Sequence, residues 1–214
     1  MGIPVLVLGR SGTGKTTALR NFKNGEIGHI NVLGKTLPFK ADFKSFVTDD
    51  YTEIKKALMS SKVDTVIIDD AGYLITNQFM RGHGSGLKGN AVFELYNDIA
   101  DNFWDLIRFV QVQLPEEKVV YFLMHEDKNE MGDVKPKTIG KMLDDKVCVE
   151  GLFTIVLRTM KKDGKYVIRT TSDGYDVTKA PIDMFEGEEI ENDLKKINEI
   201  IFEYYNLKGA KADA

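Results

Sequence analysis

Cysteine, tryptophan and proline are scarce in this chain, which has one, one and five of them among 214 residues. Because Cys148 is alone, no disulfide can form within the chain, and we expect a reducing compartment such as the cytoplasm. A single cysteine also cannot build a structural zinc site. The sequence therefore excludes disulfide-rich secreted domains and zinc modules.

Long hydrophobic runs are absent as well. The first apolar run covers residues 3–8, and no basic stretch precedes it. It is too short for a membrane span or for the core of a signal peptide. We expect a protein of the cytoplasm, or of the host cytoplasm if a phage encodes it, with no membrane partner.

The composition is that of an ordinary folded domain. Hydrophobic residues make up 43% and charged residues 29% of the chain, and the length fits one domain with an ample core. The net charge of -4 argues against a protein coated in nucleic acid, although it allows a local basic site.

Short apolar runs that alternate with amphipathic segments predict an α/β fold with a mostly parallel sheet flanked by helices. Residues 3–8, 63–68 and 119–124 are typical of strands buried on both faces. Residues 152–170 predict a C-terminal β-hairpin that turns at Asp163-Gly164. The expected division is a core over residues 1–181, followed by an acidic segment and an amphipathic helix over residues 182–214.

The connecting segments give further predictions. A helix is expected from about Lys15 to near Gly25, and a hairpin within residues 30–39. Asp50 has the spacing of a helix N-cap. A glycine-rich loop around residues 82–89 then leads to a long helix, and residues 138–144 predict a short one.

The strongest signal is a glycine-rich motif directly after the first predicted strand. Residues 9–16 match G-x-x-x-x-G-K-[ST] in full. Glycines let several N–H groups point at one phosphate, and the following helix adds its positive end. Lys15 would reach the β- and γ-phosphates of ATP, and the Thr16 hydroxyl suits Mg²⁺. The alternative is a chance glycine-rich turn. The expected ATP-binding residues are Gly9, Arg10, Ser11, Gly12, Thr13, Gly14, Lys15, Thr16 and Thr17.

A second motif is an apolar strand that ends in a carboxylate, at residues 66–70. Asp69 would sit at the carboxyl end of this strand and hold Mg²⁺ together with Thr16, through water. The alternative is a simple turn aspartate at the end of a strand. The glycine-rich motif upstream favours the metal role.

ATP hydrolysis also needs a carboxylate that orients and deprotonates the attacking water. Asp70 follows Asp69 directly, and Asp49 ends the preceding predicted strand, so both are candidates, and a third alternative is that neither serves. His125 ends a buried strand, where it would sense the γ-phosphate; a histidine bonded only to backbone is the alternative. The candidate catalytic set is therefore Lys15, Asp49, Asp70 and His125.

The order of these motifs resembles the RecA-like core of the P-loop NTPases. More closely, the chain is similar to short phage ATP-binding proteins of that type, on the segments 121–126 and 135–141. The resemblance covers roughly residues 3–181. It implies an ATPase that uses ATP and Mg²⁺, forms a homo-oligomer and acts on single-stranded DNA in recombination or replication. A single-strand-binding protein or another replication protein would be its partner.

The same resemblance implies two mobile DNA-binding loops. Residues 79–89 would provide Arg81 and Lys88, and residues 127–137 would provide Lys128, Lys135 and Lys137. A basic residue from a neighbouring subunit completes such sites, and the candidates for it are Lys141, Arg158 and Lys161. The sequence departs from the pattern at Asp70, where many relatives have glutamate.

Two other functions remain open. Nucleotide kinases clamp phosphates with several arginines in a lid, whereas the six arginines of this chain are scattered. A non-hydrolysing ATP-binding adaptor, such as a helicase loader, is favoured if neither Asp49 nor Asp70 works as a base.

Overall fold

The apolar run at the start of the chain forms the central strand β1 (Ile3–Gly9), which is buried from its second residue onward. Alternate side chains of a strand point to opposite faces. Accordingly, Leu6 and Leu8 pack into one hydrophobic cluster, and Val5 and Val7 pack into another on the other side of the sheet. This burial on both faces explains why the run contains no polar position.

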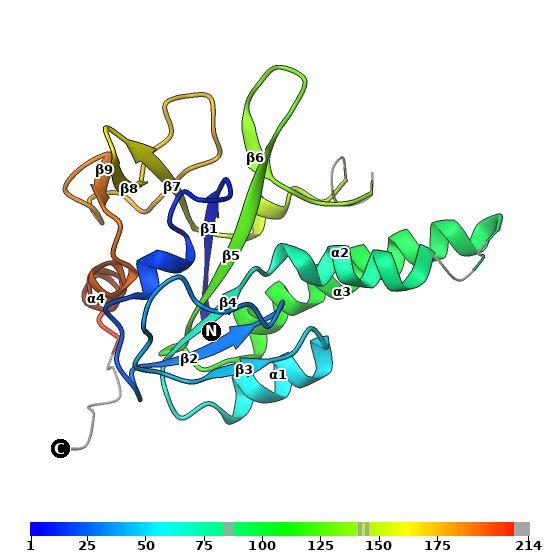
Figure 1. Ribbon diagram of the computed structural model, residues 1–214, viewed down its shortest axis with the longest axis horizontal. Coiled ribbons are helices and arrows are strands. Elements are labelled where there is room, and N and C mark those ends of the chain that lie inside the picture. The colour runs from blue at the N-terminus through cyan, green and yellow to red at the C-terminus, as the bar shows by residue number, and fades with distance from the viewer. Residues whose placement is uncertain (84–85, 87, 141–142, 144–145, 208–214) are drawn as a thin grey trace.

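The computed structural model has one mixed sheet (Figure 1). The structure describes residues 1–83, 86, 88–140, 143 and 146–207. Over these residues the strand order is β3-β2-β4-β5-β1-β7-β8-β9, with β6 paired to β5 outside this path. The strands after β1 are β2 (Ile27–Asn31), β3 (Ser45–Val47), β4 (Thr65–Asp69), β5 (Val119–Lys128), β6 (Val134–Pro136), β7 (Ile155–Lys162), β8 (Lys165–Arg169) and β9 (Glu189–Glu191).

Pairing within the sheet is parallel from β3 through β7 along this order, and antiparallel where β6, β8 and β9 join. Helices cover both faces (Figure 1). The predicted α/β class, with a mostly parallel sheet flanked by helices, is confirmed.

One face of the sheet is covered by α1 (Tyr51–Ser60), α2 (Gly72–His83) and α3 (Asn90–Gln113), whose apolar side chains join the same cluster as Leu6. The opposite face holds α4 (Leu194–Tyr204) and the short 3-10 turn η1 (Thr16–Leu19). A second 3-10 turn, η3 (Val149–Leu152), precedes β7. Every helix within the described residues is too short or too polar to cross a lipid bilayer.

Local signals explain several element boundaries. The carboxylate of Asp50 accepts a hydrogen bond from the Glu53 amide at 2.9 Å, which confirms the predicted N-cap of α1. The predicted hairpin also forms, since β7 and β8 pair across Asp163 and Gly164, both in the left-handed region. Beyond it, β9 adds to the same sheet and α4 packs on the same core.

Two predictions near the start of the chain are wrong. The helix expected from Lys15 to Gly25 is only the four-residue turn η1. The hairpin expected within residues 30–39 does not form, because β2 ends at Asn31 and its neighbour β3 runs parallel to it. A parallel neighbour requires a crossing segment, which residues 32–44 provide.

Parts of the two expected DNA-binding loops belong to a helix and to strands instead. Residues 79–83 belong to α2, so Arg81 lies on a helix; residues 84, 85 and 87 lie outside the described residues. Residues 127–137 form most of the antiparallel hairpin β5–β6, because β5 continues four residues past the predicted end of its strand. Of the short helix predicted over residues 138–144, the first three residues are irregular, and Lys141 lies outside the described residues.

Candidate functional site

The carboxyl ends of three parallel strands meet at one edge of the sheet. β5 lies between β1 and β4, with Gly9 opposite His125, while Asp69 at the end of β4 lies opposite Asn31 at the end of β2. Segments that follow these strands therefore converge, as expected for the ligand edge of a parallel sheet. The sequence motifs of residues 9–16, residues 66–70 and His125 come together here.

The loop of residues 9–16 (loop 9–16) has a backbone that only glycine suits at two positions. Gly14 has φ 95°, and a Cβ on it would lie 2.4 Å from Nδ2 of Asn192. A Cβ on Gly9 would lie 2.1 Å from Oγ1 of Thr159. Within the described part of the chain, the amides of Gly12, Gly14 and Lys15 donate no hydrogen bond. The loop therefore offers open N–H groups that an anion can accept.

Lys15 is folded back onto its own loop. Its side-chain Nζ donates to the carbonyl oxygens of Gly9 at 2.7 Å and Arg10 at 3.1 Å, and the residue is 7% exposed. Burial lowers the pKa of Lys15 to about 8, although the carboxylates of Asp70 and Asp69 oppose this shift. The ammonium thus lies in a weakly solvated position, where an added anionic group would interact with it strongly.

Asp69 is linked directly to loop 9–16. Its Oδ1 accepts hydrogen bonds from the Thr16 hydroxyl at 3.1 Å and from the Asp70 amide at 3.0 Å. Asp69 is 5% exposed, so few other groups reach its carboxylate. One hydroxyl and one carboxylate suit Mg²⁺, which takes its remaining ligands from phosphates and water. Within the described residues there is no cluster of three or more acidic, histidine or cysteine groups that would form a metal cage.

A cavity of about 370 Å³ joins these groups. Ser11, Gly12, Gly14, Lys15, Thr16 and Thr17 line it, together with Asp69, Asp70 and His125. Three predicted ATP-binding residues lie elsewhere: Arg10 lines an adjacent cavity, while Gly9 and Thr13 pack against Thr159 of β7. Gly9 and Thr13 therefore shape the loop through their contacts with β7.

Asp70 faces two basic side chains in this cavity. Its Oδ2 accepts a hydrogen bond from Lys35 Nζ at 2.7 Å, and its Oδ1 lies 3.6 Å from His125 Nε2. Burial works against the charge of Lys35, but the contact with Asp70 raises the pKa of this lysine. Burial, together with the nearby charge of Lys15, lowers the pKa of His125 and so favours its neutral imidazole, although Asp70 opposes this shift.

Asp49, the other candidate base, points to a different partner. It accepts hydrogen bonds from Asn77 at 2.8 Å and Arg81 at 2.5 Å, both on α2, and it does not line the cavity. Partial burial opposes its ionisation, but these bonds outweigh it and lower the pKa of Asp49. Of the two strands beside β4, β5 carries His125, and β2 ends in the amide Asn31. Asp70 is thus the candidate carboxylate that lies in the cavity.

The candidates for the basic residue that a neighbouring subunit would supply differ in how strongly other side chains of the chain hold them. Arg158 makes a bidentate contact with Glu126, at 2.8 and 3.0 Å, and a third contact with Asp176, and its side chain is 17% exposed. Lys161 is exposed on β7, and Lys141 lies outside the described residues. Reaching a neighbouring subunit would require Arg158 to break a buried ion cluster.

The candidate DNA-binding residues lie on two separate projections. Arg81 lies in the last turn of α2 and is paired with Asp49, while Lys88 is exposed just before α3. Lys128, Lys135 and Lys137 lie on or beside the hairpin β5–β6. Residues 127–137 carry three lysines and three acidic residues, so this hairpin has no net charge.

Sequence reasoning missed Lys35, Tyr166 and His29. Lys35 and Tyr166 line the cavity, and His29 Nε2 lies 3.6 Å from Asp69 Oδ2. Lys35 lies in the crossing segment, which has no periodic pattern, and Tyr166 comes from a hairpin far along the chain. Only His29 has a signal in the sequence. It lies two residues before Asn31 in the same strand, so both polar side chains are on one face of the sheet.

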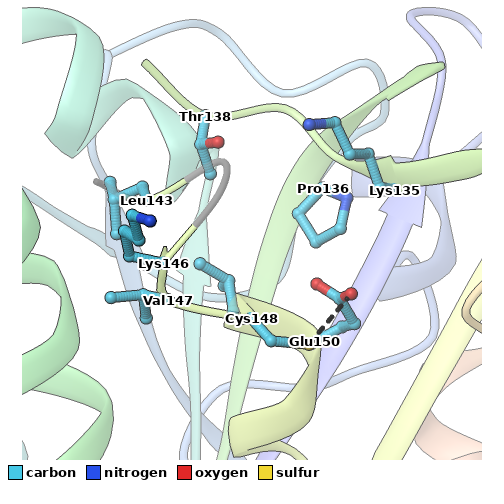
Figure 2. Close-up of a pocket in the computed structure, with 9 residues that line it drawn as sticks. Lys135, Pro136, Thr138, Leu143, Lys146, Val147, Cys148 and Glu150 are labelled. Carbon is cyan, nitrogen blue, oxygen red and sulfur yellow. Dashed lines mark hydrogen bonds between the residues drawn. The ribbon is translucent and has the colours of Figure 1, made fainter. Parts of the chain in front are cut away.

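A separate cavity of about 190 Å³ lies beside β6 (Figure 2). In it the Cys148 thiol donates to Glu150 at 3.2 Å. Burial and the neighbouring Glu150 raise the pKa of Cys148, so the thiol is a poor nucleophile at neutral pH. This cavity holds none of the residues at the carboxyl ends of β1 and β4.

The cavity at loop 9–16 thus combines open amides, a buried lysine, a hydroxyl–carboxylate pair and a second acid. Such a set can hold a phosphate chain with its magnesium and orient a water molecule next to it. No protein-family model matches the chain, and no curated protein matches it.

Proposed function

We propose that the protein is a P-loop ATPase with a RecA-like core, which binds Mg·ATP in loop 9–16 and hydrolyses it. The observation that carries the proposal is the 3.1 Å hydrogen bond from the Thr16 hydroxyl to Asp69. It joins two motifs that are 53 residues apart in sequence and that both have the chemistry of a Mg·phosphate site.

In this proposal the residues of the cavity divide the work. The amides of loop 9–16 bind phosphate oxygens, and Lys15 leaves the carbonyl oxygens of Gly9 and Arg10 to neutralise the γ-phosphate. Thr16 and Asp69 hold Mg²⁺, which supplies electrostatic stabilisation of the phosphoryl oxygens when bound. His125, whose Nδ1 lies 3.5 Å from Lys15 Nζ, contacts the terminal phosphate.

Asp70 orients and deprotonates the attacking water in the same proposal. Its ion pair with Lys35 at 2.7 Å restrains it in the free protein. The γ-phosphate, which carries more charge than a carboxylate, draws Lys35 away and leaves Asp70 free to accept a proton. Lys35 then adds a second positive charge beside the terminal phosphate.

The Lys35–Asp70 pair also favours one alternative. If this ion pair persists with ATP bound, no carboxylate of the cavity is free to act as a base. The protein would then be a non-hydrolysing adaptor that responds to ATP binding alone.

Single-stranded DNA is the proposed macromolecular substrate, on the resemblance to phage recombinases. The hairpin β5–β6 supports it, because β5 runs from His125 directly into the segment that carries Lys128. A movement of His125 at the γ-phosphate would therefore change the position of the hairpin. Since residues 127–137 have no net charge, the proposed DNA contact is weak and local.

Phosphate release from ATP tests these functions together. It is measured with Mg²⁺, with and without single-stranded DNA, and in parallel with AMP and deoxynucleoside monophosphates as acceptors. Release that DNA stimulates supports the proposal. Transfer to a monophosphate would make the protein a kinase, and tight ATP binding without turnover would make it an adaptor.

A further inference from the structure

His29 is a wholly buried histidine with an unused ring nitrogen. Its side chain has no exposed surface, and within the described residues its Nε2 has no hydrogen-bond partner. A buried polar atom without a partner is costly and therefore uncommon. This atom lies 3.6 Å from Oδ2 of Asp69, slightly too far for a hydrogen bond.

The ring of His29 is fixed in this orientation from its other side. Its Nδ1 lies 2.8 Å from the Ser45 hydroxyl, and its edge packs on Phe43 at 5.3 Å between ring centroids. The strand register explains the alignment, since β2 pairs with β3 at His29 and Ser45 and with β4 at Asn31 and Asp69.

The chemistry of the two neighbours favours one tautomer, because the Asp69 carboxylate can only accept a hydrogen bond, whereas the Ser45 hydroxyl can donate or accept one. When the Ser45 hydroxyl donates to Nδ1, the ring hydrogen resides on Nε2 and points at Asp69. The other carboxylate oxygen, Oδ1, already accepts from the Thr16 hydroxyl and from the Asp70 amide. Donors therefore flank both oxygens of the carboxylate that the proposed function assigns to Mg²⁺.

We propose that His29, oriented by Ser45, is a positioning residue that holds the carboxylate of Asp69 for Mg²⁺. The inference rests on the proposed function, because it concerns the same metal. A shift of Asp69 by a few tenths of an ångström closes the gap from Oδ2 to the Nε2 hydrogen. Hydrogen bonds of this kind behind a metal ligand typically change metal affinity by about 10- to 100-fold.

Two substitutions of His29 separate positioning from packing. In His29→Gln the side-chain amide nitrogen is as many bonds from Cβ as Nε2 is, so it can still reach Asp69. In His29→Asn the amide reaches only as far as Nδ1. Mn²⁺ binding to the protein with ATP present is measured by electron paramagnetic resonance, and ATP affinity is measured separately in excess EDTA.

We expect His29→Asn to weaken Mn²⁺ binding by about tenfold or more, with ATP affinity in EDTA unchanged. His29→Gln keeps Mn²⁺ affinity close to that of the wild type. Equal Mn²⁺ affinity in all three folded proteins would overturn the inference, even if both variants were less heat-stable.

Ser45 provides a test in which folding is not in question, because the residue is exposed on the edge strand β3. Ser45→Ala removes the hydroxyl that bonds Nδ1 and orients the ring, and we expect weaker Mn²⁺ binding. Ser45→Thr keeps the hydroxyl and retains the affinity. Unchanged Mn²⁺ affinity in Ser45→Ala contradicts the role given to this hydroxyl.

The two proposals fail in different ways. If the wild-type protein binds no Mn·ATP, the proposed function falls and this inference falls with it. If the wild type binds Mn·ATP and His29→Asn binds it equally well, only the inference about His29 is overturned.

Discussion

Lys15 decides how the cavity responds to pH. Burial lowers its pKa to about 8, so the free protein loses this positive charge within an accessible pH range. Bound phosphates would raise the pKa again, because a nearby negative charge favours the charged form of a lysine. In the proposed site, protonation of Lys15 and ATP binding would therefore be linked.

The first prediction follows from the sign of this linkage. ATP affinity is constant below pH 8, where Lys15 is protonated, and falls by up to about tenfold per pH unit above it. Calorimetric titration from pH 7 to 9.5 measures the effect. In Lys15→Arg the fall disappears, since a guanidinium stays charged throughout this range. A flat profile for the wild type would contradict the role of Lys15.

The second prediction separates the two candidate bases. Asp70→Asn lowers turnover by about 10²- to 10⁴-fold, the usual contribution of an acid–base group, and leaves ATP binding in place. Asp49→Asn is the matched control and keeps turnover near the wild-type rate, because Asp49 is bonded to Asn77 and Arg81 outside the cavity. The opposite ranking of the two variants in a phosphate-release assay would move the base to Asp49.

At the scale of elements, the third prediction concerns the hairpin β5–β6 and its proposed contact with DNA. Lys128→Ala combined with Lys137→Ala should lower the affinity for single-stranded DNA and reduce its salt dependence, by about one unit of slope for each phosphate that the protein no longer neutralises. Fluorescence anisotropy at several salt concentrations measures both quantities. Lys56→Ala, on the exposed side of α1, is the control and should change neither. An unchanged salt slope in the double variant would remove the hairpin from the DNA-binding surface.

Which elements the sequence predicts depends on how local their causes are. β1 is predictable because burial on both faces needs an uninterrupted apolar run, and α1 because Asp50 caps it within four residues. The crossing segment of residues 32–44 escapes prediction because it has no periodic pattern, and the end of α2, residues 79–83, because the glycines of residues 82–89 indicate a loop.

The candidate site divides in the same way. Loop 9–16 and Asp69 are visible in sequence because each motif is contiguous. The role proposed for His29 is not visible there, because its neighbours Ser45 and Asp69 come from two other strands. Lys35 likewise meets Asp70 only through the fold, since 35 residues separate them.

At the scale of the whole molecule, the end of the chain supports the loop near its beginning. Asn192, between β9 and α4, is buried and donates to the Gly14 carbonyl oxygen at 3.2 Å. Arg20, just after η1, donates to the carbonyl oxygen of Asn192. Asn192, which belongs to the predicted acidic segment, therefore helps to shape the proposed nucleotide cavity.

The fourth prediction tests this support. Asn192→Ala removes one buried hydrogen bond to the loop, which contributes about 1 kcal/mol, and ATP affinity should fall by roughly fivefold. Lys196→Ala, on the exposed face of α4, is the control and should leave ATP affinity unchanged. Equal ATP affinity in the two variants would mean that the loop holds its shape without the end of the chain.

Direct titration of the wild-type protein with Mg·ATP is the most immediate test of the nucleotide site. We predict saturable binding of one ATP per chain that weakens without Mg²⁺ and falls sharply in Lys15→Ala, because the terminal phosphate loses its cation. No measurable heat or affinity with folded wild-type protein would contradict the nucleotide site, and with it the ATPase.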